Sequence, residues 1–194
     1  MNFLAHIYLS GDNDLLKIGN FMADGIYGSS LNSFPDEIQK GILLHRYIDS
    51  YTDAHPVFRQ STKRLHPAYH HYAGVIVDIF YDHFLAKNWN NYNSEPLNLY
   101  TQKFYQLLQD NFTQLTDRAK GMIPYMVRQD WLGSYATTTG IARILEQMDR
   151  RTKHKSGMKN AIDELMEFYD EFEDEFTRFF ETIRIFAAGK IKTL

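Results

Sequence analysis

Apolar residues recur three and four positions apart along most of the chain, which is the spacing of one face of an α-helix. The longest such stripe lies over residues 158–187 and consists of Ile162, Leu165, Met166, Tyr169, Phe172, Phe176, Phe179 and Ile183, with acidic residues between them. The alternating pattern of strands is absent from the sequence, and so are internal repeats and linkers. The pattern therefore predicts an all-α, multi-helix bundle formed by one domain, residues 1–194.

Capping and helix-breaking residues divide this pattern into separate helices. Ser33, followed by Phe34-Pro35, predicts the start of a helix that runs to about Tyr51. His66-Pro67 predicts a break before a long helix from about Tyr69 to Trp89. Residues 1–12 fit either a helix start or an extended segment. Further helices are expected over 14–27, 57–66, 94–109, from Thr116 onward with a kink at Pro124, and over 137–152.

The first group of candidate functional residues lies in GILLHRYIDSYTD, residues 41–53. His45 and Asp49 are four apart, so their side chains lie above one another on a helix and can reach one ion or one phosphate. Arg46 supplies a fixed positive charge beside them. A buried histidine satisfied by a helical neighbour is the structural alternative. The several polar side chains of this segment argue against it, because polar groups are costly to bury without partners. The pattern favours a functional site with His45 in a catalytic or metal-binding role.

A second group lies on the predicted helix VDIFYDHFLAKNW, residues 77–89. Asp78 and Asp82 share one face inside apolar sequence, where two carboxylates repel each other unless a cation or a proton lies between them. His83 is adjacent and is a candidate catalytic residue, although it diverges by about 100° from Asp82 on a helix. The structural alternative is that one aspartate faces solvent and the other caps a neighbouring helix.

A weaker third group is formed by Asn20 and Asp24, four apart, and by His6. An aspartate followed by glycine is often only a turn residue. We nevertheless take Asp24 as a candidate metal ligand, together with His45, Asp49, Asp78 and Asp82.

Composition narrows the chemistry that these residues can perform. The chain has no cysteine, which excludes disulfides, thiolate nucleophiles and cysteine-ligated metals. A metal must then be held by histidine, carboxylate and water, which suits Mn²⁺, Mg²⁺, Fe²⁺ or Zn²⁺. The net charge of −3 does not indicate a nucleic-acid-binding protein. Neither a signal peptide nor a membrane span is predicted, so we expect a cytoplasmic protein.

Taken in order, several segments resemble the bacterial acyl carrier protein phosphodiesterases, also called acyl carrier protein hydrolases. The matching segments are NFLAH at 2–6, GNFMAD at 19–24, FP at 34–35, GILLHRYIDSYTD at 41–53 and DIFYDHFLAKNW at 78–89, with a looser match through 125–152 and the last helix. The resemblance implies removal of the 4'-phosphopantetheine group from holo-acyl carrier protein by phosphodiester hydrolysis. It also implies a divalent metal, most often manganese, and an all-helical fold distantly related to the HD-domain phosphohydrolases. The chain departs from that superfamily because it contains no His-Asp dipeptide; it has Asp82-His83 in reversed order.

The residues fit this chemistry independently of the resemblance. A divalent ion can activate water without a serine or cysteine nucleophile, and Arg46 can neutralise charge in the transition state. Docking of an acidic carrier protein calls for a local basic patch. The candidates for that patch are Arg59, Lys63 and Arg64, and the cluster from Arg150 to Lys155.

Two rival functions remain open at this point. One is an HD-like phosphohydrolase acting on nucleotides or another small phosphodiester. The other is a helical module that binds an acyl carrier protein without turning it over.

Overall fold

Helices form the framework of the molecule. The structure, a computed structural model, describes the backbone of residues 1–194 and every side chain except that of Ser29. Within this described part there are α-helices and short 3-10 helices (η) but no strand, which confirms the predicted all-α class. In chain order the elements are α1 (Phe3–Leu9), α2 (Asp14–Met22), η1 (Gly28–Ser33), α3 (Asp36–Ala54), α4 (Pro56–Tyr69), η2 (His70–Tyr72), α5 (Ala73–Lys87), η3 (Trp89–Asn91), α6 (Leu97–Asp110), η4 (Phe112–Gln114), α7 (Asp117–Arg128), α8 (Trp131–Ser134), α9 (Thr138–Arg151), η5 (Met158–Asn160), α10 (Ala161–Glu167) and α11 (Tyr169–Ile191).

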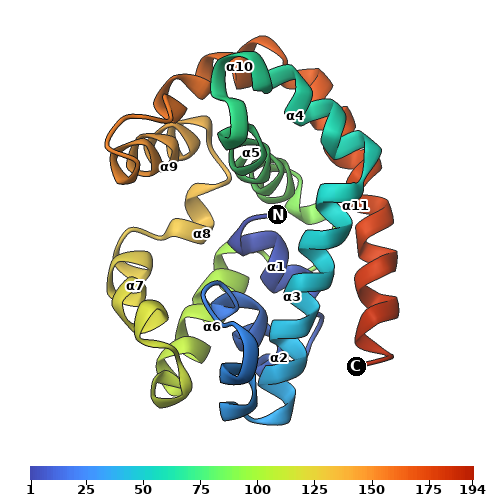
Figure 1. The fold of residues 1–194 in the computed structure, drawn as a ribbon, viewed down its shortest axis with the longest axis vertical. Helices are drawn as coiled ribbons and strands as arrows, with labels where there is room; N and C mark the ends of the chain where they lie inside the picture. The colour runs from blue at the N-terminus through green and yellow to red at the C-terminus, as the bar shows by residue number, and fades with distance from the viewer.

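Helix α5 runs through the interior, and its composition explains why. Side chains on most of its faces are apolar and inaccessible to solvent, among them Ile76, Phe80, Tyr81 and Phe84. A helix that is apolar all round can only be stable when other elements cover it. The phenylalanines of α11 pack against it, and α1, α3 and α11 lie around the same core (Figure 1). Helices α7, α8 and α9 form an arm on the opposite side from α11, which we call the α7–α9 arm (Figure 1).

Two glycines let α2 and α3 approach closely. A Cβ atom on Gly19 would lie 2.2 Å from the carbonyl oxygen of Ile38, and one on Gly41 would lie 2.3 Å from that of Leu16. Only glycine permits this backbone contact, since both distances are shorter than any real Cβ contact. The approach matters for function because it brings Asn20, next to Gly19, beside His45, one turn beyond Gly41.

The structure corrects three expected boundaries. Pro67 does not end a helix: α4 continues to Tyr69, because proline in a last turn removes only one hydrogen bond, and the chain turns at His70 with φ of 49°. Ser33 does not cap α3, which begins at Asp36 after an extended Pro35. The single helix expected over 158–187 is interrupted at Phe168, whose φ of −114° and ψ of 35° are not helical.

One residue of the expected apolar stripe lies outside the core. Met166 was expected to face the core but is 57% exposed, whereas Phe172, Phe176, Phe179 and Ile183 are fully buried.

Among the described residues, no helix combines the length and the apolarity needed to cross a membrane.

Candidate metal centre and active site

Two imidazole rings, one from α1 and one from α3, stack at the centre of the site. The centroids of the His6 and His45 rings are 4.1 Å apart, with 22° between their planes. Asn20 of α2 contacts both rings: its Oδ1 lies 2.8 Å from Nδ1 of His6 and 3.1 Å from Nδ1 of His45. Three helices therefore meet through one amide side chain.

The hydrogen bonds of Asn20 fix which ring nitrogens carry protons. Its Nδ2 donates to the His6 carbonyl oxygen and to Ser10 Oγ, both at 2.9 Å. Because a carbonyl oxygen can only accept, the amide nitrogen must face it, and Oδ1 must face the two rings. Nδ1 of both histidines therefore donates, which leaves Nε2 of each ring as the atom that faces the pocket.

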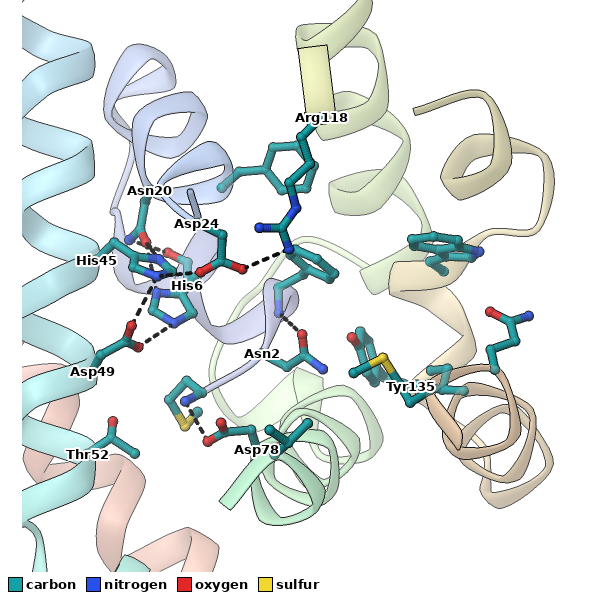
Figure 2. A pocket seen from close by; sticks show the side chains of 18 of the residues that line it. Asn2, His6, Asn20, Asp24, His45, Asp49, Thr52, Asp78, Arg118 and Tyr135 are labelled. Atoms are coloured by element: carbon teal, nitrogen blue, oxygen red, sulfur yellow. Dashed lines mark hydrogen bonds and ion pairs between the residues drawn. The ribbon is translucent and has the colours of Figure 1, made fainter. Parts of the chain in front are cut away.

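Asp49 closes the other side of the histidine pair. Its Oδ1 lies 3.2 Å from Nε2 of His6, and its Oδ2 lies 3.0 Å from Nε2 of His45, one turn before it on α3. Asp24, in the turn after α2, approaches His45 Nε2 to 3.4 Å with its Oδ1. Figure 2 shows Asp24 and Asp49 on either side of the two rings.

These charges shift the pKa values of the group in opposite directions. Burial lowers the pKa of His6 to about 4, so that ring is neutral at physiological pH. Burial alone would lower the pKa of His45 as well, but hydrogen bonds to Asp24 and Asp49 raise it to about 9. Although burial opposes the effect, the hydrogen bond from His45 holds the pKa of Asp49 well below its usual range. The hydrogen bond with His45 also lowers the pKa of Asp24.

This donor set fits a divalent metal ion. His6 Nε2 is buried and, among the described side chains, has no hydrogen-bond partner, because the neutral ring presents a lone pair to a carboxylate. One ligand atom each from His6, His45 and Asp49 lies within 4.8 Å of the others. A lone pair and a carboxylate facing each other repel, and a cation between them removes that repulsion. Two imidazoles and a carboxylate suit Mn²⁺, Fe²⁺ or Zn²⁺.

The candidate metal-binding cluster, made of His6, His45 and Asp49, lies at one end of a pocket of about 410 Å³. Helices α1, α2, α3 and α5 form one side, and the α7–α9 arm forms the other with Arg118, Trp131, Ile144, Gln147, Met148 and Arg151. Arg118 extends from α7 toward the cluster, with its NH2 3.5 Å from Asp24 Oδ2, and Tyr135 lies across the pocket (Figure 2). The pocket thus joins a polar end to a more apolar end.

Comparisons with known proteins agree with this chemistry. The sequence profile of the acyl carrier protein phosphodiesterase family matches residues 1–183. The chain belongs to this family. It is 30% identical over 181 residues to the acyl carrier protein phosphodiesterase of Pectobacterium atrosepticum, covering 93% of this chain and 94% of the relative. Identity to the proteins of that name is 29% in Photorhabdus laumondii (93% and 91% covered) and 28% in Yersinia pestis (94% and 95%).

The family name describes a phosphoric diester hydrolase. No solved structure matched the chain, so the expected likeness to HD-domain proteins stays a prediction. Of the site residues predicted from the sequence, three lie together in the structure: His45 Nε2 lies close to carboxylate oxygens of both Asp24 and Asp49.

Asp82 lies outside the cluster and has a different set of contacts. Its side chain is fully buried, and its oxygens accept backbone N–H groups of Asn2 at 3.2 Å, Leu4 at 2.7 Å and Ala5 at 3.3 Å. These are unpaired donors at the start of α1, so Asp82 caps that helix from a distance. Because α1 carries His6, Asp82 helps to position that histidine from outside the cluster.

Asp78 lines the pocket but is engaged by the chain's first residue. Its Oδ1 lies 2.7 Å from the amino nitrogen of Met1. Together Asp78 and Asp82 hold the segment that leads into α1, at the lower edge of the pocket in Figure 2.

Arg46 and His83, the other two candidates, do not line the pocket. Arg46 donates through NH2 to the carbonyl oxygen of Ile26 at 2.8 Å and so anchors the turn that contains Asp24. His83 donates through Nδ1 to the carbonyl oxygen of Tyr135 at 2.7 Å, and its Nε2 accepts from the Tyr169 hydroxyl at 2.7 Å. Burial lowers the pKa of His83, so it acts as a neutral link between α5 and the arm.

Three residues of the site were undervalued or missed from sequence: His6, Asn20 and Arg118. The first two were visible as polar residues in apolar segments, but their partners are on other helices. Arg118 gave no signal at all, because its approach to Asp24 depends on how the α7–α9 arm packs.

The two basic clusters differ in the structure. Arg64 donates to both oxygens of the buried Glu175, at 2.8 and 2.7 Å, so its charge is neutralised inside the protein. Arg59 donates to the Asp53 carbonyl oxygen, and Lys63 lies at a separate surface groove. In the second cluster, Arg151 lines the pocket itself.

Proposed function

We propose that the chain is a cytoplasmic, metal-dependent phosphodiesterase that removes 4'-phosphopantetheine from holo-acyl carrier protein. The reaction hydrolyses the phosphodiester that joins the arm to a serine of the carrier. The names of the family and the relatives support the substrate. The observation that carries the metal dependence is the pair of His6 and His45 Nε2 atoms held toward Asp49 by Asn20.

Four side chains make up the ligand set in this proposal. His6 and His45 bind through Nε2, Asp49 binds between them, and Asp24 completes the set from the side of Arg118. Mn²⁺ is the first choice, and Mg²⁺, Fe²⁺ and Zn²⁺ are the alternatives. Asp78 and Asp82, included in the set expected from sequence, instead support the position of α1 and of its ligand His6.

The roles of the chain's residues follow from their positions. When bound, a divalent ion polarises the phosphoryl oxygens and lowers the pKa of a coordinated water. Asn20 orients both imidazoles. Arg118 provides the positive charge at the pocket that Arg46 was expected to provide. Its guanidinium, more than half exposed and near Asp24, can bind a nonbridging phosphoryl oxygen as charge develops there.

Intact-mass spectrometry of holo-acyl carrier protein tests this function. The carrier is incubated with the protein and Mn²⁺, with a parallel sample in a chelator. We expect loss of the phosphopantetheine mass only when free metal is present. His45→Gln should abolish the loss, whereas His71→Gln, on the exposed surface, should not change it.

Two outcomes separate the rival functions. An unchanged carrier mass together with hydrolysis of a nucleotide or another small phosphodiester would move the substrate assignment to that class. Binding of the carrier without hydrolysis of any phosphodiester, and equally strong in His45→Gln, would identify a binding module. Titration of Mn²⁺ by calorimetry accompanies each assay, so that loss of metal is distinguished from loss of activity.

A further inference from the structure

Helix α9 has two faces, and only one of them packs in the core. Ile141, Leu145 and Asp149 are fully buried toward the protein interior. A second row at helical spacing lines the pocket: Ile144, Gln147, Met148 and Arg151. Ile144 and Met148 are only partly buried, so apolar side chains of this row face the pocket.

Other apolar side chains continue this surface. Trp131 of α8 and Val75 of α5 also line the pocket, and Val75 is 37% exposed. Arg151 lies over the Trp131 ring, 5.9 Å from its centroid. We call the pocket-lining residues of α8 and α9, with Tyr135 between these helices, the α8–α9 wall. The wall faces the metal-binding cluster across the pocket (Figure 2).

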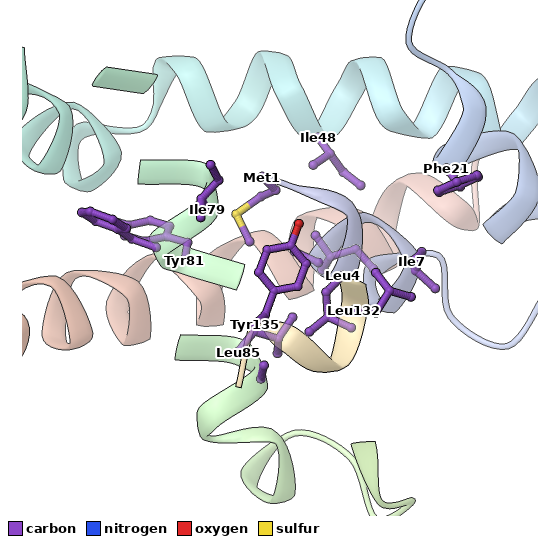
Figure 3. Packing of buried hydrophobic residues seen from close by; sticks show 14 of the residues in the cluster. Met1, Leu4, Ile7, Phe21, Ile48, Ile79, Tyr81, Leu85, Leu132 and Tyr135 are labelled. Carbon is purple, nitrogen blue, oxygen red and sulfur yellow. The ribbon is translucent and has the colours of Figure 1, made fainter. Parts of the chain in front are cut away.

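Tyr135 adds a polar group to the wall. Tyr135 as a whole is 2% exposed, and its ring belongs to the same core cluster as Met1, Leu4 and Leu132 (Figure 3). Its hydroxyl has no hydrogen-bond partner among the described residues, although the residue lines the pocket. Among the described side chains only His6 Nε2 is both buried and unpaired, so the Tyr135 hydroxyl is accessible from the pocket and available to a ligand. His83 holds the tyrosine in place, because its Nδ1 donates a hydrogen bond to the Tyr135 carbonyl oxygen.

We propose that the α8–α9 wall binds the pantetheine arm of the substrate and thereby determines specificity. This inference rests on the proposed function, since it concerns the other end of the same substrate. The arm is an uncharged chain of methyl and methylene groups interrupted by amides and ending in a thiol. Ile144, Met148 and Trp131 contact its apolar parts, and the Gln147 amide and the Tyr135 hydroxyl pair with its amide groups.

Charge distribution gives the arm its direction in the pocket. Arg118 and the metal-binding cluster lie at the end where the anionic phosphodiester belongs. The apolar members of the wall, Ile144, Met148 and Trp131, lie on the opposite side and suit an uncharged chain, and Arg151 lies over the Trp131 ring beside them.

Binding of free pantetheine, which lacks phosphate, tests the proposal without hydrolysis or metal. The pocket contains Trp131, whereas Trp89, the other tryptophan of the chain, is 2% exposed and its Nε1 donates to the Glu95 carbonyl oxygen. We expect a saturable change in tryptophan emission in the wild type and its loss in Trp131→Phe.

Variants of α9 provide the matched comparison. Met148→Tyr fills the pocket and should raise the Kd for pantetheine about tenfold or more. Glu146→Tyr, on the exposed face of the same helix, should keep the wild-type Kd. Tyr135→Phe removes one hydroxyl and should raise the Kd about fivefold. With holo-acyl carrier protein, Met148→Tyr and Tyr135→Phe should act mainly through KM, and circular dichroism should show wild-type helix content.

The possible results separate this inference from the proposed function. Absence of a saturable pantetheine signal, or a wild-type Kd and KM in Met148→Tyr, would overturn the inference even if the carrier is hydrolysed. Pantetheine binding that Met148→Tyr weakens, together with an unchanged carrier mass, would support the wall and overturn the proposed reaction alone.

Discussion

Helices α3 and α5 carry similar residues at the same spacing but use them differently. On α3, His45 and Asp49 are four apart, partly exposed and directed into the pocket. On α5, Asp78 and Asp82 are also four apart, but Asp82 is fully buried and accepts three backbone N–H groups at the start of α1. Equal spacing thus supports a ligand site in one helix and a structural cap in the other.

The difference lies in what each helix faces. The pocket side of α3 meets α1 and α2, which contribute His6 and Asn20. Most of helix α5 is surrounded by the core, and its two carboxylates are satisfied by nearby donors of the first residues of the chain. A pair of acidic residues therefore indicates a metal site only when other ligands and an opening are present.

Replacing a ligand on α3 should give the largest effect. We expect Asp49→Ala to lower phosphodiesterase activity by about a thousandfold or more, because the proposed metal loses the carboxylate ligand that lies beside both histidine Nε2 atoms. Its free energy of unfolding should change by less than about 1 kcal/mol, because the side chain is 45% exposed. Urea unfolding and manganese titration measure the two quantities. Asp36→Ala, exposed on the same helix, is the control, and retained metal binding in Asp49→Ala would contradict the ligand assignment.

The corresponding change on α5 should affect folding instead. Asp82→Ala leaves three backbone donors without an acceptor, two of them buried, and should lower the free energy of unfolding by about 3 kcal/mol, or about a hundredfold in the folding equilibrium. The urea midpoint reports this loss. The folded fraction should still bind manganese. Its affinity should fall only if His6 is displaced. Wild-type stability combined with lost metal binding would show that α5 supplies a ligand after all.

Asn20 offers a test of the contact between the two histidines. Asn20→Ala removes the acceptor shared by both Nδ1–H groups, and we expect manganese affinity to fall about 10- to 100-fold. Asn13→Ala, which removes the cap of α2, is the control and should reduce stability without this loss of affinity. Equal affinity in Asn20→Ala and wild type would mean that the rings are oriented by packing alone.

The effect that is smallest per step is the pH dependence of metal binding, which is expected to be about tenfold for each pH unit. His45, with a pKa of about 9, must lose one proton to the solvent before it can bind a metal, whereas His6, with a pKa of about 4, is already neutral. Metal affinity should therefore rise about tenfold per pH unit between pH 6 and 8, and the slope should flatten above the pKa of His45. Calorimetric titrations in several buffers measure both the affinity and the released proton. A flat profile would show that His45 is neutral before the metal binds.

The sequence determined the helical class, the buried aromatic face of α11 and the pair His45 and Asp49 on one helix face, because each depends on local periodicity. Spacing along one helix is fixed by the backbone, so side chains four apart share a face in any tertiary context. The similarity of NFLAH, GNFMAD and the segments 41–53 and 78–89 to the acyl carrier protein phosphodiesterases also predicted the family. The break at Phe168 was not predictable, because apolar spacing continues through it while the backbone does not.

Only the tertiary structure decided which polar residues meet. Gly19 and Gly41 permit the close approach that brings Asn20 to His45, and Asp82 holds α1 so that His6 reaches the same point. Arg118 and the α8–α9 wall reach the pocket from residues far away in sequence. Partners on different helices follow no common period, since their distances depend on how whole helices pack. For that reason the sequence identified the kind of chemistry, and the packing of α1, α2, α3 and the α7–α9 arm decided which residues are placed to perform it.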